Sequence, residues 1–362
     1  MALNQIDLFT HRTLLGVIEK TIKSQTFLRD QFFPTIRNFD TETVDVDIVD
    51  RRDRTIAKFS AEDGQGHINY RKGFITENFR PAYVCEKFVI TGKDLRKRAP
   101  GEPIYQGGLD LDMANRRMRF EVARGLQDIE NKMTRLEEWM IAQAILTGKV
   151  PVKGLGVDAE FNFWRYLNAS EKPVTNLTTA WTASGAKPLD DLNLICEDIA
   201  KQVGLVPREF IMGTKVWRAL RNHLVNDGKA TLDIRRIELG NIAPRKADTN
   251  AVSYKGHLLD PDLDLYVYTG NYQGEDGKIH YYIPDDVGVI VCEDAEKYTY
   301  RAYGSVSIVD DATGVTSLAA APRVPDAWVQ RDTPSGQVVR VQSAPLMILS
   351  EPRAFHVVKG AA

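Results

Sequence analysis

The side chains that most often bind metals or act as nucleophiles are sparse in this sequence. Its three cysteines lie far apart without a CxxC pair: Cys85, Cys196 and Cys292. A small, odd number of cysteines is typical of a reducing compartment and argues against a disulfide framework or a cysteine-rich zinc site. The six histidines are equally scattered, with no HExxH motif and no paired ligand spacing: His11, His67, His223, His257, His280 and His356.

Three short segments imitate known binding loops, and each lacks a required residue. Asp260–Asp264 resembles the start of a calcium loop, but Leu265 replaces the turn glycine and Asn271 replaces the bidentate glutamate. The glycine pairs at 64 and 66 and at 154 and 156 lack the third glycine of a dinucleotide-binding loop. Neither a phosphate-binding GxxxxGK loop nor a GxSxG nucleophile motif occurs. We therefore predict no catalytic site, no metal and no cofactor; a cytoplasmic enzyme with an unrecognised site stays an alternative.

Composition excludes several broad classes of protein. The 362 residues are 43% hydrophobic and 27% charged, which is typical of a folded chain of two or three domains. The 47 basic and 49 acidic residues give a net charge of −2, whereas a dedicated nucleic-acid binder usually carries a basic excess. No apolar run approaches the ~18 residues of a membrane span, and the first residues do not form a signal peptide. We expect a soluble protein made in the cytoplasm.

The strongest periodic pattern lies between Asp110 and Thr147. Apolar residues recur there at alternating steps of four and three, which predicts a long helix with one buried stripe: Val122, Leu126, Ile129, Met133, Leu136 and Met140. At 1.5 Å per residue this helix would be on the order of 55 Å long. We expect the stripe to form core against a sheet of the same subunit. A coiled coil is the rival interpretation, although the stripe lasts less than four heptads.

The N-terminal quarter alternates between apolar and polar segments. Residues 8–33 have helical spacing and predict a helix packed either on its own domain or on a neighbouring subunit. Residues 43–49 and 82–91 read as strands. The thirty residues between them predict a polar hairpin, with strand-like pieces at Ile56–Phe59 and His67–Tyr70. An excursion of this length usually has a function. Its bases are candidates for contacts with another chain: Arg51, Arg52, Arg54, Lys58, Arg71 and Lys72.

The remainder of the chain predicts a mixed domain. We expect a loop over 92–108, a hairpin over 150–166, helices over 188–203 and 214–226, and a strand over 209–212 between these helices. Further strands are expected near 251–254, 263–268, 280–283 and 288–292. Residues 312–336 read as irregular, and 338–341 and 346–349 as closing strands. The fold class is therefore α+β.

Several stretches resemble the lambda-type major capsid protein E family of tailed bacteriophages. The segment Val341–Leu349, followed by Glu351, Pro352 and Phe355, is similar to the family's C-terminal end. Ala251–Gly256 with Leu265–Tyr272, Ala327–Val329 and the end of the long helix are further matches in the same order. Together the matches span nearly the whole chain and thin out at 160–187 and 310–325.

The resemblance implies the Hong Kong 97-type capsid fold and a domain order. Family anatomy would make 1–49 an N-terminal arm, 50–90 an extended E-loop hairpin and 91–187 a peripheral domain with a spine helix over 110–148. Residues 188–325 would form the axial domain, and 326–362 would return to the peripheral domain.

The implied function is structural. Many copies would form the hexamers and pentamers of an icosahedral shell, assembled in the host cytoplasm and enclosing double-stranded phage DNA in the virion. The implied partners are copies of the chain itself, a scaffold or protease, a portal and a decoration protein, with packaged DNA contacted weakly and without specificity, and no membrane. The shell of a bacterial nanocompartment, which shares the fold, is the alternative.

Overall fold

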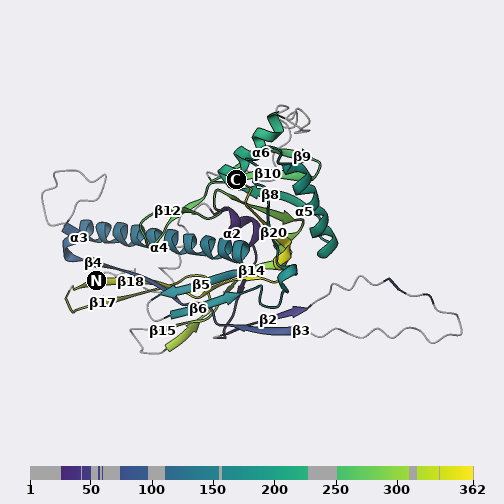
Figure 1. Ribbon diagram of the computed structural model, residues 1–362. Helices are drawn as coiled ribbons and strands as arrows, with labels where there is room; N and C mark the ends of the chain where they lie inside the picture. Colours follow the sequence, from purple (N-terminus) through teal and green to yellow (C-terminus); the bar gives the residue numbers. More distant parts are fainter. Residues whose placement is uncertain are drawn as a thin grey trace.

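A computed structural model describes residues 26–41, 43–49, 56–57, 59, 74–96, 111–154, 157–226, 251–309, 316–333 and 335–361. The described residues form an elongated lower part, built on one long helix and several long strands, and a compact upper part built on a six-stranded sheet (Figure 1). None of the helices in these ranges has the length and apolar character that a membrane span needs.

The lower part is organised around α4 (Leu111–Thr147), a helix of 37 residues. It lies along an antiparallel sheet of order β17-β18-β4, formed by Val324–Gln330, Gly336–Ser343 and Val84–Thr91. Four residues of α4 share a small core with the strands of this sheet: Val122, Leu126, Ile129 and Met133 pack with Ile90, Val339 and Val341. The stripe therefore faces a sheet, as expected for a helix in a globular core rather than a coiled coil.

The upper part is a mixed sheet of order β7-β20-β13-β8-β10-β9. Its strands are Val174–Asn176, Phe355–Lys359, Val287–Cys292, Pro207–Met212, Asp262–Tyr268 and Val252–Leu259. The helices α5 (Pro188–Gln202) and α6 (Thr214–Asn226) bury their apolar sides in one core cluster with one face of this sheet. The other face packs against the C-terminal half of α4 and the short helix α2 (Phe27–Phe32).

Short sheets and single turns complete the chain. A three-stranded sheet of order β1-β14-β19 joins Ile36–Asn38, Thr299–Tyr303 and Pro345–Leu349. The two-stranded pairs are β2 (Val44–Val49) with β3 (Phe74–Phe79), β5 (Lys149–Gly154) with β6 (Val157–Asn162), β11 (Asn271–Gln273) with β12 (Ile279–Tyr281), and β15 (Val306–Val309) with β16 (Thr316–Ala319). Helix α3 (Gly92–Arg96) and 3-10 turns at Ala169–Glu171, Ala295–Tyr298 and Pro352–Ala354 connect them.

Most predicted elements are present, and four expectations need correction. The expected loop 92–108 begins with α3, because Asp94 accepts hydrogen bonds from the backbone N–H and the hydroxyl of Thr91 (3.1 and 2.7 Å). Residues 312–336 contain strands β16 and β17. Residues 56, 57 and 59 carry no strand. Of the helix expected over 8–33, only the end lies within the described residues, as α2.

The fourth correction concerns the end of the chain. Residues 326–362 were expected to return wholly to the peripheral domain, but β20 pairs with β13 and β7 inside the upper sheet. Conversely, β14 and the first two residues of β17, Val324 and Pro325, were expected in the axial domain but pair with β19 and β18. The sheets therefore exchange strands across the expected boundary at 325.

Candidate assembly site: a buried polar junction and a projecting hairpin

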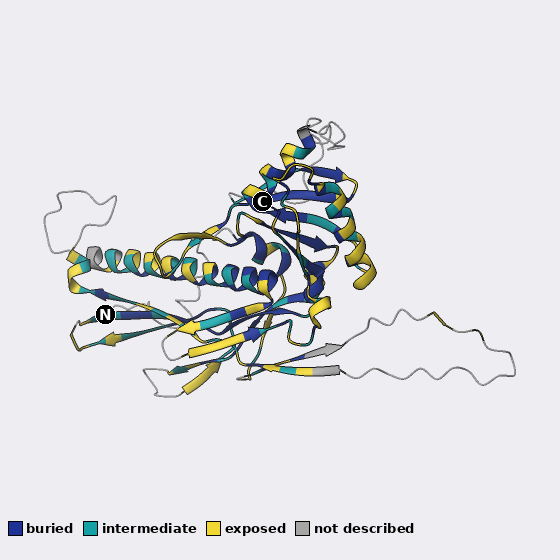
Figure 2. Ribbon diagram, viewed as in Figure 1, coloured by how far each residue is buried: buried dark blue, intermediate teal, exposed yellow. Residues whose placement is uncertain are grey.

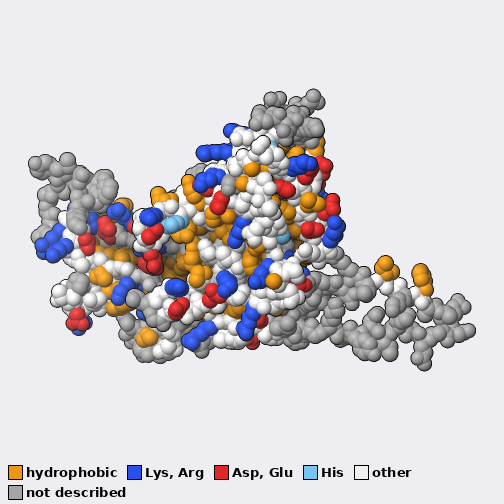
Figure 3. All heavy atoms as spheres, in the orientation of Figure 1, with side chains coloured by type: hydrophobic (Ala, Val, Ile, Leu, Met, Phe, Trp, Pro, Cys, Tyr) orange, Lys and Arg blue, Asp and Glu red, His pale blue; other side chains and the backbone are white. Residues whose placement is uncertain are grey.

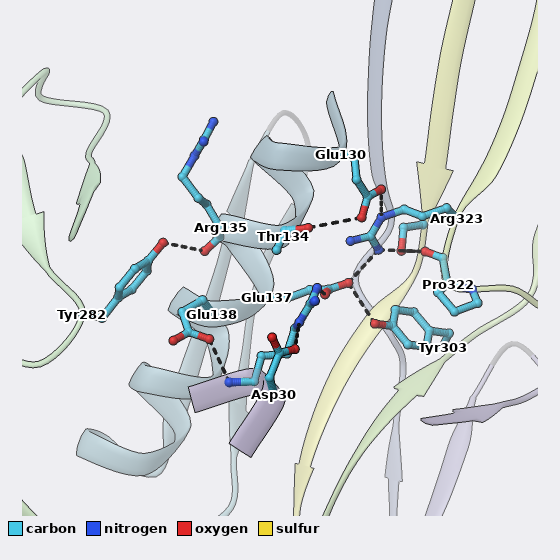
Figure 4. Close-up of polar contacts among 12 residues, drawn as sticks. Asp30, Glu130, Thr134, Arg135, Glu137, Glu138, Tyr282, Tyr303, Pro322 and Arg323 are labelled. Atoms are coloured by element: carbon cyan, nitrogen blue, oxygen red, sulfur yellow. Dashed lines mark hydrogen bonds and ion pairs between the residues drawn. The ribbon is translucent and has the colours of Figure 1, made fainter. Parts of the chain in front are cut away.

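Two adjacent glutamates near the C-terminal end of α4 are fully buried. Glu137 and Glu138 have exposed fractions of 1% and 0%. They lie where α4 meets α2, β14 and the residues that precede β17 (Figure 4). Since an unpaired buried carboxylate is very costly, the groups around these two residues decide what this junction does.

Glu137 is paired with two arginines from distant parts of the chain. Its Oε1 accepts from Arg323 Nη1 (2.6 Å) and from the hydroxyl of Tyr303 (2.9 Å), and its Oε2 accepts from Arg29 Nη1 (3.2 Å). Burial alone would raise the pKa of Glu137, but the two guanidinium groups and the Tyr303 hydrogen bond outweigh it and hold that pKa below its ordinary value. Glu137 is therefore a buried anion.

Arg323 is shared between two carboxylates of α4. Its Nε donates to Glu130 Oε2 (2.8 Å), and its Nη1 also donates to the carbonyl of Pro322 (2.9 Å). Burial would lower the pKa of Arg323, but Glu137 and Glu130 outweigh that effect and raise it. The hydroxyl of Thr134 donates to the other oxygen of Glu130 (3.2 Å). The carboxylates of one helix face thus hold the chain just before β17 against α4.

Glu138 holds the first turn of α2. Its Oε1 accepts from the backbone N–H of Leu28 (2.8 Å) and from the hydroxyl of Tyr268 (2.6 Å), and its Oε2 accepts from the backbone N–H of Arg29 (2.9 Å). The first N–H groups of a helix have no intrahelical acceptor, so this carboxylate satisfies two of them. Burial raises the pKa of Glu138, and the three donors oppose that rise only in part.

The junction is filled by its own side chains. Its charged groups bind one another, and the cavity beside α2 has a volume of about 10 Å³ and an apolar lining that includes Leu28, Phe32 and Ile145. A space of this size holds at most one water molecule. Within the described ranges, no three His, Cys, Asp or Glu side chains are grouped as metal ligands would be. The contacts of the junction fix α2 onto α4 and β10.

The sequence analysis did not single out Glu137 and Glu138 as buried, yet a signal was present. Glu130, Thr134 and Glu137 repeat the spacing of four and three, one residue after the apolar stripe. At 3.6 residues per turn, Glu137 lies about 60° to one side of Val122 around the helix axis. A polar row parallel to an apolar stripe indicates a second buried face.

The same geometry corrects one member of the predicted stripe. Val122, Leu126, Ile129, Met133 and Met140 are buried, whereas Leu136 is only partly buried. Leu136 lies about 40° to the other side of Val122, away from Glu137. Because the C-terminal half of α4 is covered by α2, β19 and β20, its buried face turns toward Glu137 and leaves Leu136 at the margin.

The β2–β3 hairpin is anchored at its base and runs out of the lower part of the molecule (Figure 2). Val44, Val46 and Phe79 are buried in the main core. Farther along, the side chains of Ile56 and Phe59 have exposed fractions of 90% and 102%. The basic residues proposed for contacts with another chain lie outside the described residues: Arg51, Arg52, Arg54, Lys58, Arg71 and Lys72.

Comparisons with known proteins agree over nearly the whole length of the chain. The family model of phage major capsid protein E matches residues 10–359. A prophage-derived major head protein of Escherichia coli is 30% identical over 359 residues, covering 97% of this chain and 99% of its own. The major capsid protein of Escherichia phage lambda is 26% identical over 356 residues, covering 97% and 98%. The solved structure of a putative prophage capsid protein of Escherichia coli has a TM-score of 0.66 at 24% identity, covering 97% and 99%.

These matches, with the long helix, the mixed sheet and the projecting hairpin, define the class as a shell-building protein with the Hong Kong 97-type α+β fold. The chain belongs to the family of phage major capsid protein E. Its function is that of a major capsid protein, and its location is the capsid of the virion. The family is a structural one, and a capsid is built by self-association of many copies.

Proposed function

We propose that this chain forms hexameric and pentameric rings that close an icosahedral shell around double-stranded phage DNA, and that it has no catalytic activity. The observation that carries this proposal is the β2–β3 hairpin. Its base is fixed in the core, and it leads to two large apolar side chains, Ile56 and Phe59, that none of the described residues covers. Large apolar side chains exposed in this way mark interaction sites, and neighbouring copies would bury them.

We divide the subunit into five segments, in line with the sheets that its strands form. Residues 1–49 are an N-terminal arm, 50–90 an E-loop and 91–187 a peripheral domain with the spine helix α4. Residues 188–325 are mainly axial, and 326–362 return to the peripheral domain except for β20, which completes the axial sheet. The Glu138 contacts join α2, which lies within residues 1–49, to α4 of the proposed peripheral domain.

Further partners of the shell are a scaffold or protease, a portal and a decoration protein, and the DNA is contacted weakly. The near-neutral composition, with 47 basic and 49 acidic residues, supports weak contact. Each phosphate neutralised by a lysine or arginine adds affinity, and a strongly basic lining would impede the movement of DNA during packaging.

The test is electron microscopy of shells formed by the full chain and by two variants. Deletion of Thr55–Tyr70, or the double substitution Ile56→Ser with Phe59→Ser, should give a soluble subunit with an unchanged melting temperature that does not form closed shells. The matched control, Ile56→Val with Phe59→Leu, keeps both side chains apolar and should assemble. Normal shells from the deletion variant would contradict the E-loop assignment.

The contents of the particles separate this function from the alternatives. A nanocompartment shell would enclose protein cargo in the producing cell, whereas the proposed shell encloses packaged DNA. A soluble enzyme would form no shell when expressed alone.

A further inference from the structure

The two helices on the outer face of the upper sheet carry opposite charge. Both α5 and α6 bury their apolar sides in one cluster with the sheet, through residues such as Ile195 and Leu220. Their other sides are exposed, and Figure 2 shows the outer side of α5 largely in yellow. No described element covers either outer side, so both are available to a second molecule.

The exposed side of α5 is acidic around one apolar residue. Asp190, Glu197 and Asp198 are exposed, and Leu194 between them has an exposed fraction of 62%. Two lysines at the ends of the helix pair with two of these acids, Lys187 with Asp190 (3.3 Å) and Lys201 with Glu197 (2.9 Å). Asp191 and Asp198 have no lysine partner among the described residues, so the remaining charge is negative. The carboxylate of Asp191 accepts from the indole N–H of Trp181 (3.0 Å).

The exposed side of α6 is basic. Lys215, Arg218 and Arg221 follow one another at steps of three, so they share one side of the helix, and all three are exposed. The helix Thr214–Asn226 contains no acidic residue. In the part of the chain that the structure describes, none of the three bases has an ion pair. This row of cations therefore lacks a partner of opposite charge within the described subunit.

The two surfaces lie on different sides of the upper part. In Figure 3, acidic side chains gather along its right flank, where α5 lies, and basic side chains lie along the opposite, upper left edge beside α6. A surface that meets a different surface of the next copy makes a head-to-tail contact, and such a contact closes into a ring when the rotation permits. Two complementary helices of 15 and 13 residues, both about 20 Å long, suit such a contact.

We propose that, within each ring of the shell, the acidic side of α5 in one copy docks on the basic side of α6 in the next copy. This inference rests on the proposed function and names the contact that joins neighbours in a ring. Leu194 is the apolar centre of the contact, and the carboxylates around it select the basic partner. Charge complementarity fixes the register of the two helices and speeds association.

Charge reversal with rescue tests the contact in the full-length protein. Arg218→Glu with Arg221→Glu, or Glu197→Lys with Asp198→Lys, should lower the yield of closed shells about tenfold or more, because like charges then face each other. The chain that carries all four substitutions should assemble again, since each acid again meets a base. Melting temperatures of the unassembled subunits should stay unchanged, because all four side chains are exposed.

A matched control separates this contact from a general effect of charge. Lys187→Glu with Lys201→Glu changes the net charge as much as the α6 reversal does, but it makes the acidic surface of α5 more acidic. This variant should assemble as well as the unmodified chain. If the control and the α6 reversal lower the yield of closed shells equally, the proposal is overturned.

Mixing the two reversed subunits gives a sharper test. A subunit with a reversed α5 pairs with one that has a reversed α6, in either order, but neither pairs with its own kind. The two must therefore alternate around a ring, which is possible with six members and impossible with five. We expect hexamers without pentamers, and hence sheets or open tubes in place of closed shells.

Two other results would refute the contact. If the four-substitution chain fails to assemble although both parent variants fold, the helices do not face each other. If the α6 reversal forms normal shells that retain less DNA, the basic side of α6 contacts nucleic acid instead. Failure of the unmodified chain to form any shell would count against the proposed function and not against this contact alone.

Discussion

Glu137→Gln tests whether the buried junction holds the subunit together. The substitution keeps the shape of the side chain and one acceptor oxygen, but it removes the negative charge that faces Arg323 and Arg29. Breaking a buried ion pair by removing one partner costs roughly 3–5 kcal/mol. Arg323 keeps its contact with Glu130 and Arg29 keeps Asp30, so we expect the lower end, about 3 kcal/mol.

The loss should depend on pH in a defined direction. The pKa of Glu137 lies below its ordinary value of 4.5, so its ionised form favours the folded state. That contribution is complete above pH 4.5 and disappears as the pH falls through the lower pKa of the folded protein. The difference in unfolding free energy between the unmodified chain and Glu137→Gln should therefore be constant from pH 7 to about pH 5 and shrink below that.

Denaturant unfolding of the unassembled subunit at several pH values is the assay. Glu160→Gln serves as the control, because the Lys149–Glu160 pair is about half exposed on both sides and should be worth less than about 1 kcal/mol. If Glu137→Gln costs no more than Glu160→Gln, or if its cost grows on acidification, the carboxylate of Glu137 is not the buried anion described here.

Three further predictions concern α4 and the turn that follows it. Glu138→Gln should show the opposite pH trend in unfolding experiments, with a smaller cost at neutral pH than in acid, because burial raises the pKa of Glu138 and its ionised form disfavours folding. Ile129→Ala should lower the free energy of unfolding by roughly 2–5 kcal/mol and Leu136→Ala by only about 1–2 kcal/mol, as measured by denaturant unfolding. Equal losses would contradict the finding that Leu136 is only partly buried. Gly148→Ala should cost roughly 1–3 kcal/mol in thermal unfolding, since Gly148 has a φ of +67° and an added Cβ would lie 2.1 Å from Trp164, whereas Gly154→Ala, with nothing within 4 Å, should be nearly neutral.

The elements predicted from the sequence are those whose signal is local. The stripe of α4, the proline and acids that open α5, and the alternation of β2 each lie within one segment, so periodicity and capping were sufficient to place them. The resemblance to a capsid family then supplied the fold class, which neither composition nor spacing defines.

Elements that depend on contacts with residues distant in sequence were not predicted. Strand β17 contains Pro325 and Asp326, which favour a loop by local preference. It is an edge strand, where a proline is tolerated, and Asp326 accepts from Arg340 of the neighbouring strand (2.6 and 2.9 Å). The burial of Glu137 and Glu138 could not be seen for the same reason, because Arg323 and Tyr268 lie more than 100 residues away in sequence.

The position of β20 has a consequence for how the subunit is made. Thr175 and His356, whose side chains are hydrogen bonded between β7 and β20, are 181 residues apart. Contacts at this separation form late, because a long loop must close first. During synthesis, β13 and β7 have no strand between them until the ribosome has released residue 359. A nascent chain therefore cannot complete the upper sheet before β20 has left the ribosome, so the face that this sheet offers to neighbouring copies forms only late in synthesis.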